Sequence, residues 1–346
     1  MYSESSFGSL DLPESMRNAL ANLANHSLAS RTWSTYKTVE KHLSKCQHDT
    51  GIDLNFPMDT KSILIFTHWL VHNRGLKGAT VNTYISGLRQ IHLVKGHDIP
   101  ALRPPILQQI LAGKKNLDAV VARETKKPKR LPVTINVMKL LKLEIRKLQD
   151  TNTNKALLWS VCTLAFNGCM RIHELLARKE TEFDIHTTLL HKDVSISPPK
   201  EDGYREIQLK LKSPKEDRVG NGKIIDIYET KGPLCPVRAL QRWSRLSKHE
   251  EKNLPLFRLE NGKNLTGRSF NKMLKLMLGK HLNYQNGSIT SHSFRSGLAT
   301  LMGQLGFPDH QIMAMGRWSS SCFETYLKLP RSRRMEIAKQ IGNHIP

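Results

Sequence analysis

The chain has 346 residues, enough for two domains of ordinary size that each bury a core. Its 53 Lys and Arg residues against 30 Asp and Glu give a net charge of +23, which favours a polyanionic partner, with nucleic acid first and an anionic membrane surface second. No stretch approaches ~20 uninterrupted apolar residues, and Met1 to Leu12 lack the pattern of a signal peptide, so we expect a soluble intracellular protein. The five cysteines form no Cys-x-x-Cys pair, which argues against a zinc ribbon or a disulfide framework.

The first 120 residues show helical periodicity. Residues 1–27 have little pattern beyond Met16 to Leu23, and we predict a flexible arm there. Further helices are predicted from Ser30 to about Cys46, from Thr60 to about His72, from Thr80 onward, and from Ile106 to Leu111 with an end at Gly113. These elements predict a compact helical domain over residues 28–120.

Residues 121–130 break the pattern and predict a basic interdomain linker. The segment ends in Lys126-Lys127-Pro128-Lys129-Arg130, whose proline disfavours a continuing helix. A basic run of this kind is either a solvated linker or a nuclear-import signal. The sequence leaves both readings open.

A second domain is predicted over residues 131–346. Helical patterns cover Ile135 to Leu148 and Lys155 to Phe166. Between about 183 and 228 the period changes to that of a strand: Ile207, Leu209 and Leu211 alternate with polar residues, and Ile225 and Ile227 resume the alternation after Gly220-Asn221-Gly222. The fold class is therefore mainly α with a small β-sheet or hairpin.

Two arginines stand in contexts suited to a phosphodiester. Arg171 lies three residues before Glu174, whose carboxylate could hold the guanidinium in place. Arg295 lies three residues after His292, and Ser291 is a natural cap for a helix that would place both side chains on its first turn. An arginine fork donates two parallel hydrogen bonds to phosphate oxygens. The opposite face of this helix would pack through Phe294, Leu298, Leu301 and Leu305.

A tyrosine follows these groups in the chain. Gly316-Arg317-Trp318-Ser319 leads to Tyr326, on a short helical pattern that begins near Ser321. A phenol has a free pKa of about 10, so it becomes a nucleophile only beside cations and a base. Arg171, Arg295 and His292 are candidates for that role, and packing is the ordinary alternative for Tyr326.

The order of these motifs resembles the active site of the tyrosine recombinases, the phage-integrase family. That family orders arginine, lysine, histidine-x-x-arginine, histidine or tryptophan, and tyrosine, and this chain offers Arg171, a lysine, His292, Arg295, Arg317-Trp318 and Tyr326. The resemblance covers about residues 30–346 and implies a two-domain clamp, with a helical core-binding domain and a mixed α/β catalytic domain. Within the family, the chain looks most like enzymes of DIRS/Ngaro-type retrotransposons and Crypton-like eukaryotic elements.

Two assignments within the resemblance stay open. It implies a catalytic lysine on the hairpin, for which Lys215 is the first choice and Lys212 and Lys223 are rivals. The family's histidine or tryptophan usually follows the glycine directly, but Arg317 occupies that position here and Trp318 comes next. Either residue could serve the phosphate, and a packing role for Trp318 is the alternative.

The resemblance implies a site-specific recombinase or integrase that cuts and rejoins DNA through a 3′-phosphotyrosyl link, with no metal and no cofactor. Its partners would be double-stranded DNA and three further copies of the chain in a tetramer, with Met335 to Ile341 as a helix passed to a neighbour. It implies integration of a mobile element, in the nucleus if the source is eukaryotic and otherwise in the cytoplasm. The alternatives are a domesticated DNA-binding protein that kept the fold and a type IB topoisomerase.

Overall fold

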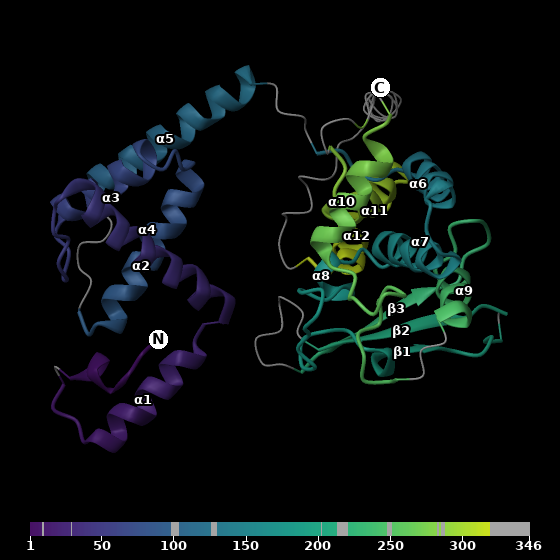
Figure 1. Cartoon of the computed structure of the whole chain (residues 1–346), viewed down its shortest axis with the longest axis horizontal. Helices are drawn as coiled ribbons and strands as arrows, with labels where there is room; N and C mark the ends of the chain where they lie inside the picture. Colours follow the sequence, from purple (N-terminus) through teal and green to yellow (C-terminus); the bar gives the residue numbers. More distant parts are fainter. Residues whose placement is uncertain are drawn as a thin grey trace, which may run out of the picture. The chain divides into compact units, whose positions relative to one another are not determined.

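The computed structural model describes residues 1–8, 10–28, 30–97, 104–125, 130–201, 203–212, 221–247, 251–281, 284 and 288–318. The chain divides into two compact units, unit 1 (Met1–Lys127) and unit 2 (Pro128–Pro346), and the division falls within the predicted linker 121–130. The described residues are mostly helical with one small antiparallel sheet (Figure 1), so the predicted fold class is confirmed. No helix among these residues has both the length and the apolar character needed to cross a membrane.

Unit 1 is helical throughout its described residues. Its elements are η1 (Glu4–Phe7), α1 (Glu14–His26), α2 (Ser30–Thr50), α3 (Thr60–His72), α4 (Gly78–Val94) and α5 (Pro105–Glu124). One core joins α2, α3 and α4, with Val39, Phe66 and Leu88 fully buried in it. The helical spacing of these apolar side chains in the sequence explains why each helix buries one face.

The last helix of unit 1 is longer than predicted. The sequence pattern ended it at Gly113, whereas α5 runs on to Glu124 and so extends into the segment predicted as linker. A glycine inside a helix costs only ~1 kcal/mol relative to alanine. That cost is offset by an ion pair one turn apart, with Lys114 Nζ 2.6 Å from Asp118 Oδ1, and by a 2.7 Å hydrogen bond from the Gly78 amide to Asp118 Oδ2.

The segment 1–27, expected to be an arm, is tied to the rest of unit 1. The Tyr2 amide donates to Asn25 Oδ1 at 2.8 Å, and the Gln90 amide group of α4 donates to the Tyr2 hydroxyl at 2.8 Å. The Trp33 indole donates to the Asn25 carbonyl at 3.1 Å. Hydrogen bonds and the edge contact between the Tyr2 and Trp33 rings, with centroids 5.9 Å apart, hold this segment, and neither appears as a periodic apolar pattern in the sequence.

Unit 2 combines helices with a three-stranded sheet. Its described elements are α6 (Ile135–Lys147), α7 (Asn152–Asn167), α8 (Ile172–Leu175), η2 (His191–Asp193), β1 (Val194–Ile196), β2 (Glu206–Leu211), β3 (Lys223–Tyr228), α9 (Pro236–Ser247), α10 (Gly267–Leu278), α11 (His292–Gln304) and α12 (Asp309–Gly316). The strands run antiparallel in the order β1-β2-β3, with Ile207 opposite Ile227 and Leu209 opposite Ile225. In Figure 1 β3 is the strand nearest to α7 and α9.

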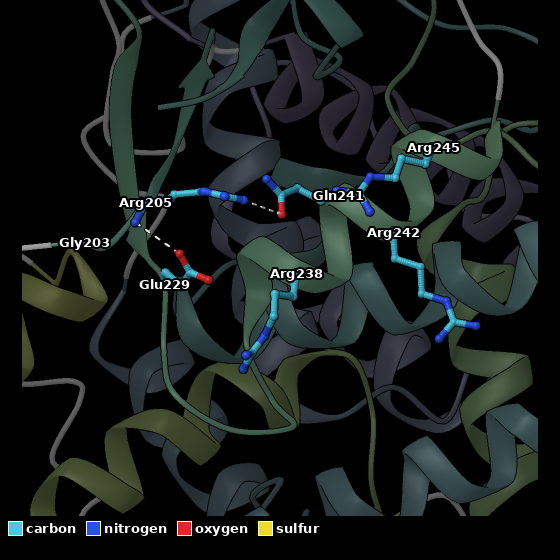
Figure 2. Close-up of a pocket in the computed structure, with 7 residues that line it drawn as sticks. All are labelled: Gly203, Arg205, Glu229, Arg238, Gln241, Arg242 and Arg245. Carbon is cyan, nitrogen blue, oxygen red and sulfur yellow. Dashed lines mark hydrogen bonds between the residues drawn. The ribbon is translucent and has the colours of Figure 1, made fainter. Parts of the chain in front are cut away.

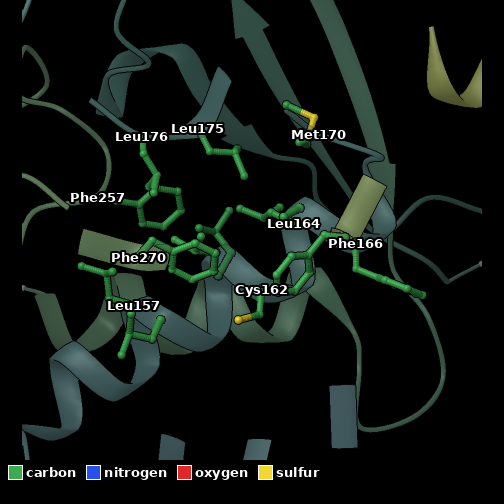
Figure 3. Packing of buried hydrophobic residues seen from close by; sticks show 14 of the residues in the cluster. Leu157, Cys162, Leu164, Phe166, Met170, Leu175, Leu176, Phe257 and Phe270 are labelled. Atoms are coloured by element: carbon green, nitrogen blue, oxygen red, sulfur yellow. The ribbon is translucent and has the colours of Figure 1, made fainter. Parts of the chain in front are cut away.

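Helix α7 is the centre of the unit 2 core. Its residues from Ala156 to Phe166 are almost all buried, as expected of a helix that is apolar on every side. Figure 3 shows Leu157, Cys162 and Leu164 of this helix among side chains from later segments, including Phe257 and Phe270. The end of α7 is thereby fixed in place, and the candidate site begins there.

Helix α11 differs from the prediction at both ends. Ser291 stands at the N-cap position, but its side chain makes no capping hydrogen bond, and its backbone is already helical with φ −55° and ψ −30°. Its amide instead donates to Asn271 Oδ1 at 2.8 Å. At the other end the helix stops at Gln304, so Leu305 is exposed rather than part of the buried face.

Candidate active site

The turn that follows α7 carries an unusual backbone. Cys169 has φ 48°, and the one other described non-glycine residue with positive φ is Arg317, at φ 54°. Such left-handed residues are uncommon outside glycine and persist where surrounding contacts fix them. Here the turn presents the carbonyls of Gly168 and Cys169 to two arginines, which satisfy acceptors left over at the helix end.

Gly168 is required by packing at this turn. A Cβ atom placed on it would lie 2.6 Å from Ile227 Cδ1 of β3 and 3.0 Å from the Leu164 carbonyl. The first contact is shorter than Cβ atoms show in proteins and the second is tighter than most, so a larger residue would require the Ile227 side chain or the turn to shift. The glycine of the Gly-x-x-Arg motif therefore leaves room for Ile227 of β3 beside the end of α7.

Arg171 and Glu174 form the local pair that the sequence predicted. Arg171 is the N-cap of α8, where its amide donates to Glu174 Oε2 at 2.8 Å and its Nη1 to Oε1 at 3.1 Å. The Glu174 side chain is 3 % exposed and that of Arg171 17 %. The carboxylate thus fixes the backbone and the guanidinium of Arg171 together.

Arg317 binds the same carboxylate from a distant part of the chain. It is the left-handed C-cap of α12, and its Nη2 lies 2.8 Å from Glu174 Oε2. Its Nη1 donates to the Gly168 carbonyl at 3.0 Å, and its own side chain is 8 % exposed. Arg317 therefore links α12 to α8 and to the end of α7.

Arg295 lies on the first turn of α11, as the sequence predicted, and its side chain is buried. It is 1 % exposed, its Nη1 donates to the Cys169 carbonyl at 2.7 Å, and its Nη2 donates to the Gly316 carbonyl. The Trp318 ring lies against it, with the Arg295 Cζ 4.6 Å from the ring centroid, a cation–π contact. The same ring occupies the space where a Cβ on Gly316 would be, which explains the glycine before Arg317.

His292 faces positive charge. Although the residue is exposed, partial burial lowers the pKa of its imidazole below the ordinary 6.5, and the charges of Arg130, Arg295 and Arg171 lower it further. The ring is accordingly neutral near pH 7 and can accept a proton. Arg130 was assigned to the linker by sequence, so its contribution to this site was missed.

The site carries an excess of positive charge. Arg171, Arg295 and Arg317 face one carboxylate, Glu174, so the group has a net charge of +2. Burial lowers the pKa of the Arg295 guanidinium, and the like charges of Arg171 and Arg317 lower it further. Burial also raises the pKa of the Cys169 thiol to about 11, which keeps it protonated among these cations. An anion with several oxygen atoms would complete this charge balance.

The hairpin lysines separate into distinct environments. Lys212 Nζ lies 2.6 Å from Asp193 Oδ2 and donates to the Ile185 carbonyl at 2.9 Å, so it is held by η2 and the loop before it. Lys223 begins β3 and is exposed. Lys212 and Glu174 line the same small pocket between α8 and the end of β2, so the chain leaves β2 beside the arginine cluster.

Direct contacts thus join five of the predicted site residues: Arg171, Glu174, Arg295, Arg317 and Trp318. His292 lies close enough for the charges of Arg171 and Arg295 to lower its pKa. Lys215 and Tyr326 lie outside the described residues, as do the predicted linker residues 126–129 and the helix from Met335 to Ile341. Within the described ranges, no group of three or more His, Cys, Asp or Glu side chains is placed to hold a metal ion.

The fold of this chain matches solved structures of other proteins. No protein-family model and no curated protein matches the sequence. The structure of the Tn1549 transposon integrase in complex with transposon right-end DNA matches with a TM-score of 0.57 and 14% identity, over 91% of this chain and 95% of that one. The XerH site-specific recombinase bound to palindromic difH substrate matches with a TM-score of 0.55 and 15% identity, over 88% and 78%. This chain therefore has the fold of a transposon integrase and a site-specific recombinase.

Proposed function

We propose that this protein is a tyrosine-type site-specific DNA recombinase that cleaves and rejoins DNA through a 3′-phosphotyrosyl intermediate. The observation that carries the proposal is that Arg295 donates to the Cys169 carbonyl, two residues before Arg171, while the charges of both arginines act on His292. These residues are the ones the motif order selects, and Arg171 lies more than 120 positions before His292 and Arg295 in the chain. The shared fold supports the same reading.

In the proposed reaction the Tyr326 oxygen attacks the scissile phosphorus, and the bond to the 5′ oxygen breaks. Arg171 and Arg295 stabilise the negative charge of the pentacoordinate transition state, and neutral His292 takes up the tyrosine proton. Lys215 protonates the leaving 5′ oxygen. The new phosphotyrosyl ester conserves the energy of the broken bond, so rejoining is the reverse reaction and consumes no nucleotide.

Arg317 and Trp318 have supporting roles in this proposal. The fork of Arg317 donates to Glu174 and to the Gly168 carbonyl, so it positions Arg171 and the turn. Trp318 packs on the Arg295 guanidinium and limits its orientation. In this proposal Arg317 and Trp318, the two candidates for the position of the family's histidine or tryptophan, both act as positioning residues.

We propose double-stranded DNA as the substrate and a homotetramer on paired sites as the active assembly. The net charge of +23 fits binding dominated by phosphate contacts, which weakens steeply with salt. The structural neighbours are an integrase of a transposon and a recombinase on its own site, and integration of a mobile element is the corresponding role here. We also propose, on the sequence resemblance, a DIRS/Ngaro-like or Crypton-like origin, with a nuclear location if the source is eukaryotic and a cytoplasmic one otherwise.

The decisive experiment is a suicide-substrate assay with nicked DNA from the ends of the element that encodes the chain. Wild type should give a covalent protein–DNA adduct that survives denaturation, and Tyr326→Phe should bind the DNA with unchanged affinity but give no adduct. Arg171→Ala should reduce the cleavage rate about 100- to 1,000-fold, the usual cost of one transition-state donor. Glu182→Gln, on the surface, is the matched control and should cleave as wild type.

Three other outcomes would reject parts of the proposal. DNA binding without an adduct on any flanking sequence would favour a domesticated DNA-binding protein that kept the fold. An adduct that persists in Tyr326→Phe would mean that another residue is the nucleophile. Relaxation of supercoiled plasmid by a monomer, without paired sites, would favour a type IB topoisomerase.

A further inference from the structure

A second cationic site lies in unit 2, away from the arginines described above. Figure 2 shows an open pocket of about 490 Å³ between the start of β2, the residue after β3, and α9. The volume falls within the usual range for sites that hold small ligands. Its lining residues are Gly203, Arg205, Glu229, Arg238, Gln241, Arg242 and Arg245.

The arginines reach this pocket because of their spacing. Arg238, Arg242 and Arg245 lie four and three residues apart and so share one face of α9. Arg205 comes from the strand side, and its Nη1 donates to Gln241 Oε1 at 3.1 Å. In Figure 2 Arg205 and Arg245 extend toward Gln241 from opposite sides.

Little negative charge balances this cluster. Among the residues that the structure describes, Glu229 is the one acidic residue that lines the pocket, and its Oε2 already accepts a hydrogen bond from the Arg205 amide at 3.2 Å. Among the described residues Arg242 and Arg245, both exposed, form no ion pair.

The crowding of like charges extends to α6. Burial lowers the pKa of Lys142, and the charges of Arg146, Arg238 and Arg242 lower it further. Lys142 Nζ donates to the Pro233 carbonyl at 3.0 Å and lies 5.3 Å from the Trp159 ring centroid, so a neutral acceptor and an aromatic ring hold it instead of a carboxylate. Cations gathered along α9 with one carboxylate, Glu229, described among them are costly unless an anion joins them.

We propose that this pocket, the α9 arginine pocket, binds phosphate groups of a ligand that carries two or more of them. Guanidinium forks from two elements suit bidentate contacts to adjacent phosphates, and Gln241 adds an amide donor. The ligand is either a free polyphosphate or successive phosphates of a nucleic-acid backbone. None of the seven lining residues belongs to the arginine cluster at Gly168–Cys169, so the inference does not rest on the proposed recombinase function.

The test is calorimetric titration of the full chain with inorganic pyrophosphate at fixed ionic strength. Arg242→Gln/Arg245→Gln should weaken binding about tenfold or more, since each substitution removes charge-assisted hydrogen bonds. Both residues are exposed, so the variant should unfold at the wild-type temperature. Lys115→Gln/Arg123→Gln removes the same charge from exposed positions on α5 and should bind as wild type.

A second arm separates the two sources of phosphate. Binding of a random-sequence duplex is measured by fluorescence anisotropy with the same two double variants. A larger loss in the α9 variant than in the α5 variant identifies a nucleic-acid backbone as ligand, whereas equal duplex binding with weakened pyrophosphate binding identifies a free polyphosphate. The proposal is overturned if wild type binds neither probe, or if the α9 variant binds both probes as tightly as the α5 variant does.

Discussion

Replacing Glu174 by glutamine is expected to destabilise unit 2 through the two arginines that share its carboxylate. Glu174 accepts three hydrogen bonds, from the Arg171 amide at 2.8 Å, Arg171 Nη1 at 3.1 Å and Arg317 Nη2 at 2.8 Å. Removing one partner of a buried ion pair usually costs about 3–5 kcal/mol. Glutamine keeps one acceptor oxygen, so we expect a loss of about 2–3 kcal/mol in the free energy of unfolding.

Differential scanning calorimetry of the full chain measures this effect. A loss of this size lowers the melting temperature of unit 2 by about 4–12 °C, and the transition of unit 1 should not move. Glu182→Gln provides the matched control: Glu182 pairs with Lys179 at the same i,i+3 spacing, at 2.5 Å, but both side chains are about two-thirds exposed. Exposed pairs contribute little to stability. Equal melting temperatures for the two variants would refute the reasoning that Glu174 holds a buried arginine pair.

Three further predictions concern packing, protonation and the hairpin. Gly168→Ala should destabilise unit 2 in urea unfolding, since its Cβ would meet β3 at 2.6 Å, whereas Gly113→Ala should stabilise unit 1 by about 0.5–1 kcal/mol because that helical glycine has open space around it. The pKa of His292 is lower in the folded state than in the unfolded chain. Below pH 6.5 the imidazole is therefore protonated in the unfolded chain before it is protonated in the folded state. Its contribution to stability is therefore present above pH 6.5 and lost as the pH falls toward the lowered pKa, so the stability of wild type should drop more steeply there than that of His292→Gln. A substrate with sulfur in place of the bridging 5′ oxygen should restore cleavage to Lys215→Ala but not to Lys212→Ala, because the latter lysine is held by a carboxylate.

Each of these has an outcome that counts against it. Equal free energies of unfolding for Gly168→Ala and Gly113→Ala would show that Ile227 of β3 accommodates the added Cβ at position 168 without loss of stability. Parallel stability curves for wild type and His292→Gln across pH 5–7 would remove the case for a neutral imidazole. Rescue of Lys212→Ala by the sulfur substrate would make that lysine the general acid.

The sequence predicted what depends on short-range pattern. The alternation of Ile207, Leu209 and Leu211 located β2, and their burial confirms the face assigned to the core. The i,i+3 spacing of Arg171 and Glu174 predicted their contact. Such features follow from helical and strand periods, which a single sequence displays directly.

Contacts between distant segments could not be predicted in this way. Arg317 appeared as a departure from the family pattern, and only the fold reveals that its guanidinium meets Glu174, 143 positions earlier in the chain. Arg130 was predicted to lie in a basic linker, but the Val133 amide donates to the Ser293 carbonyl at 2.9 Å, which brings that segment to the start of α11. Both contacts depend on how distant segments pack in the fold, and the spacing of residues along the sequence does not predict them.

The cysteines offer a way to observe the opening of each unit. Cys46 in unit 1 and Cys162, Cys169 and Cys235 in unit 2 are buried free thiols, and burial raises the pKa of the thiols at 46, 162 and 169. Alkylating reagents attack the exposed thiolate, so these positions react only when their surroundings open. Cys169 lies within the arginine cluster, and its labelling rate, read by peptide mass spectrometry, would report how often the candidate site opens while the rest of unit 2 stays folded.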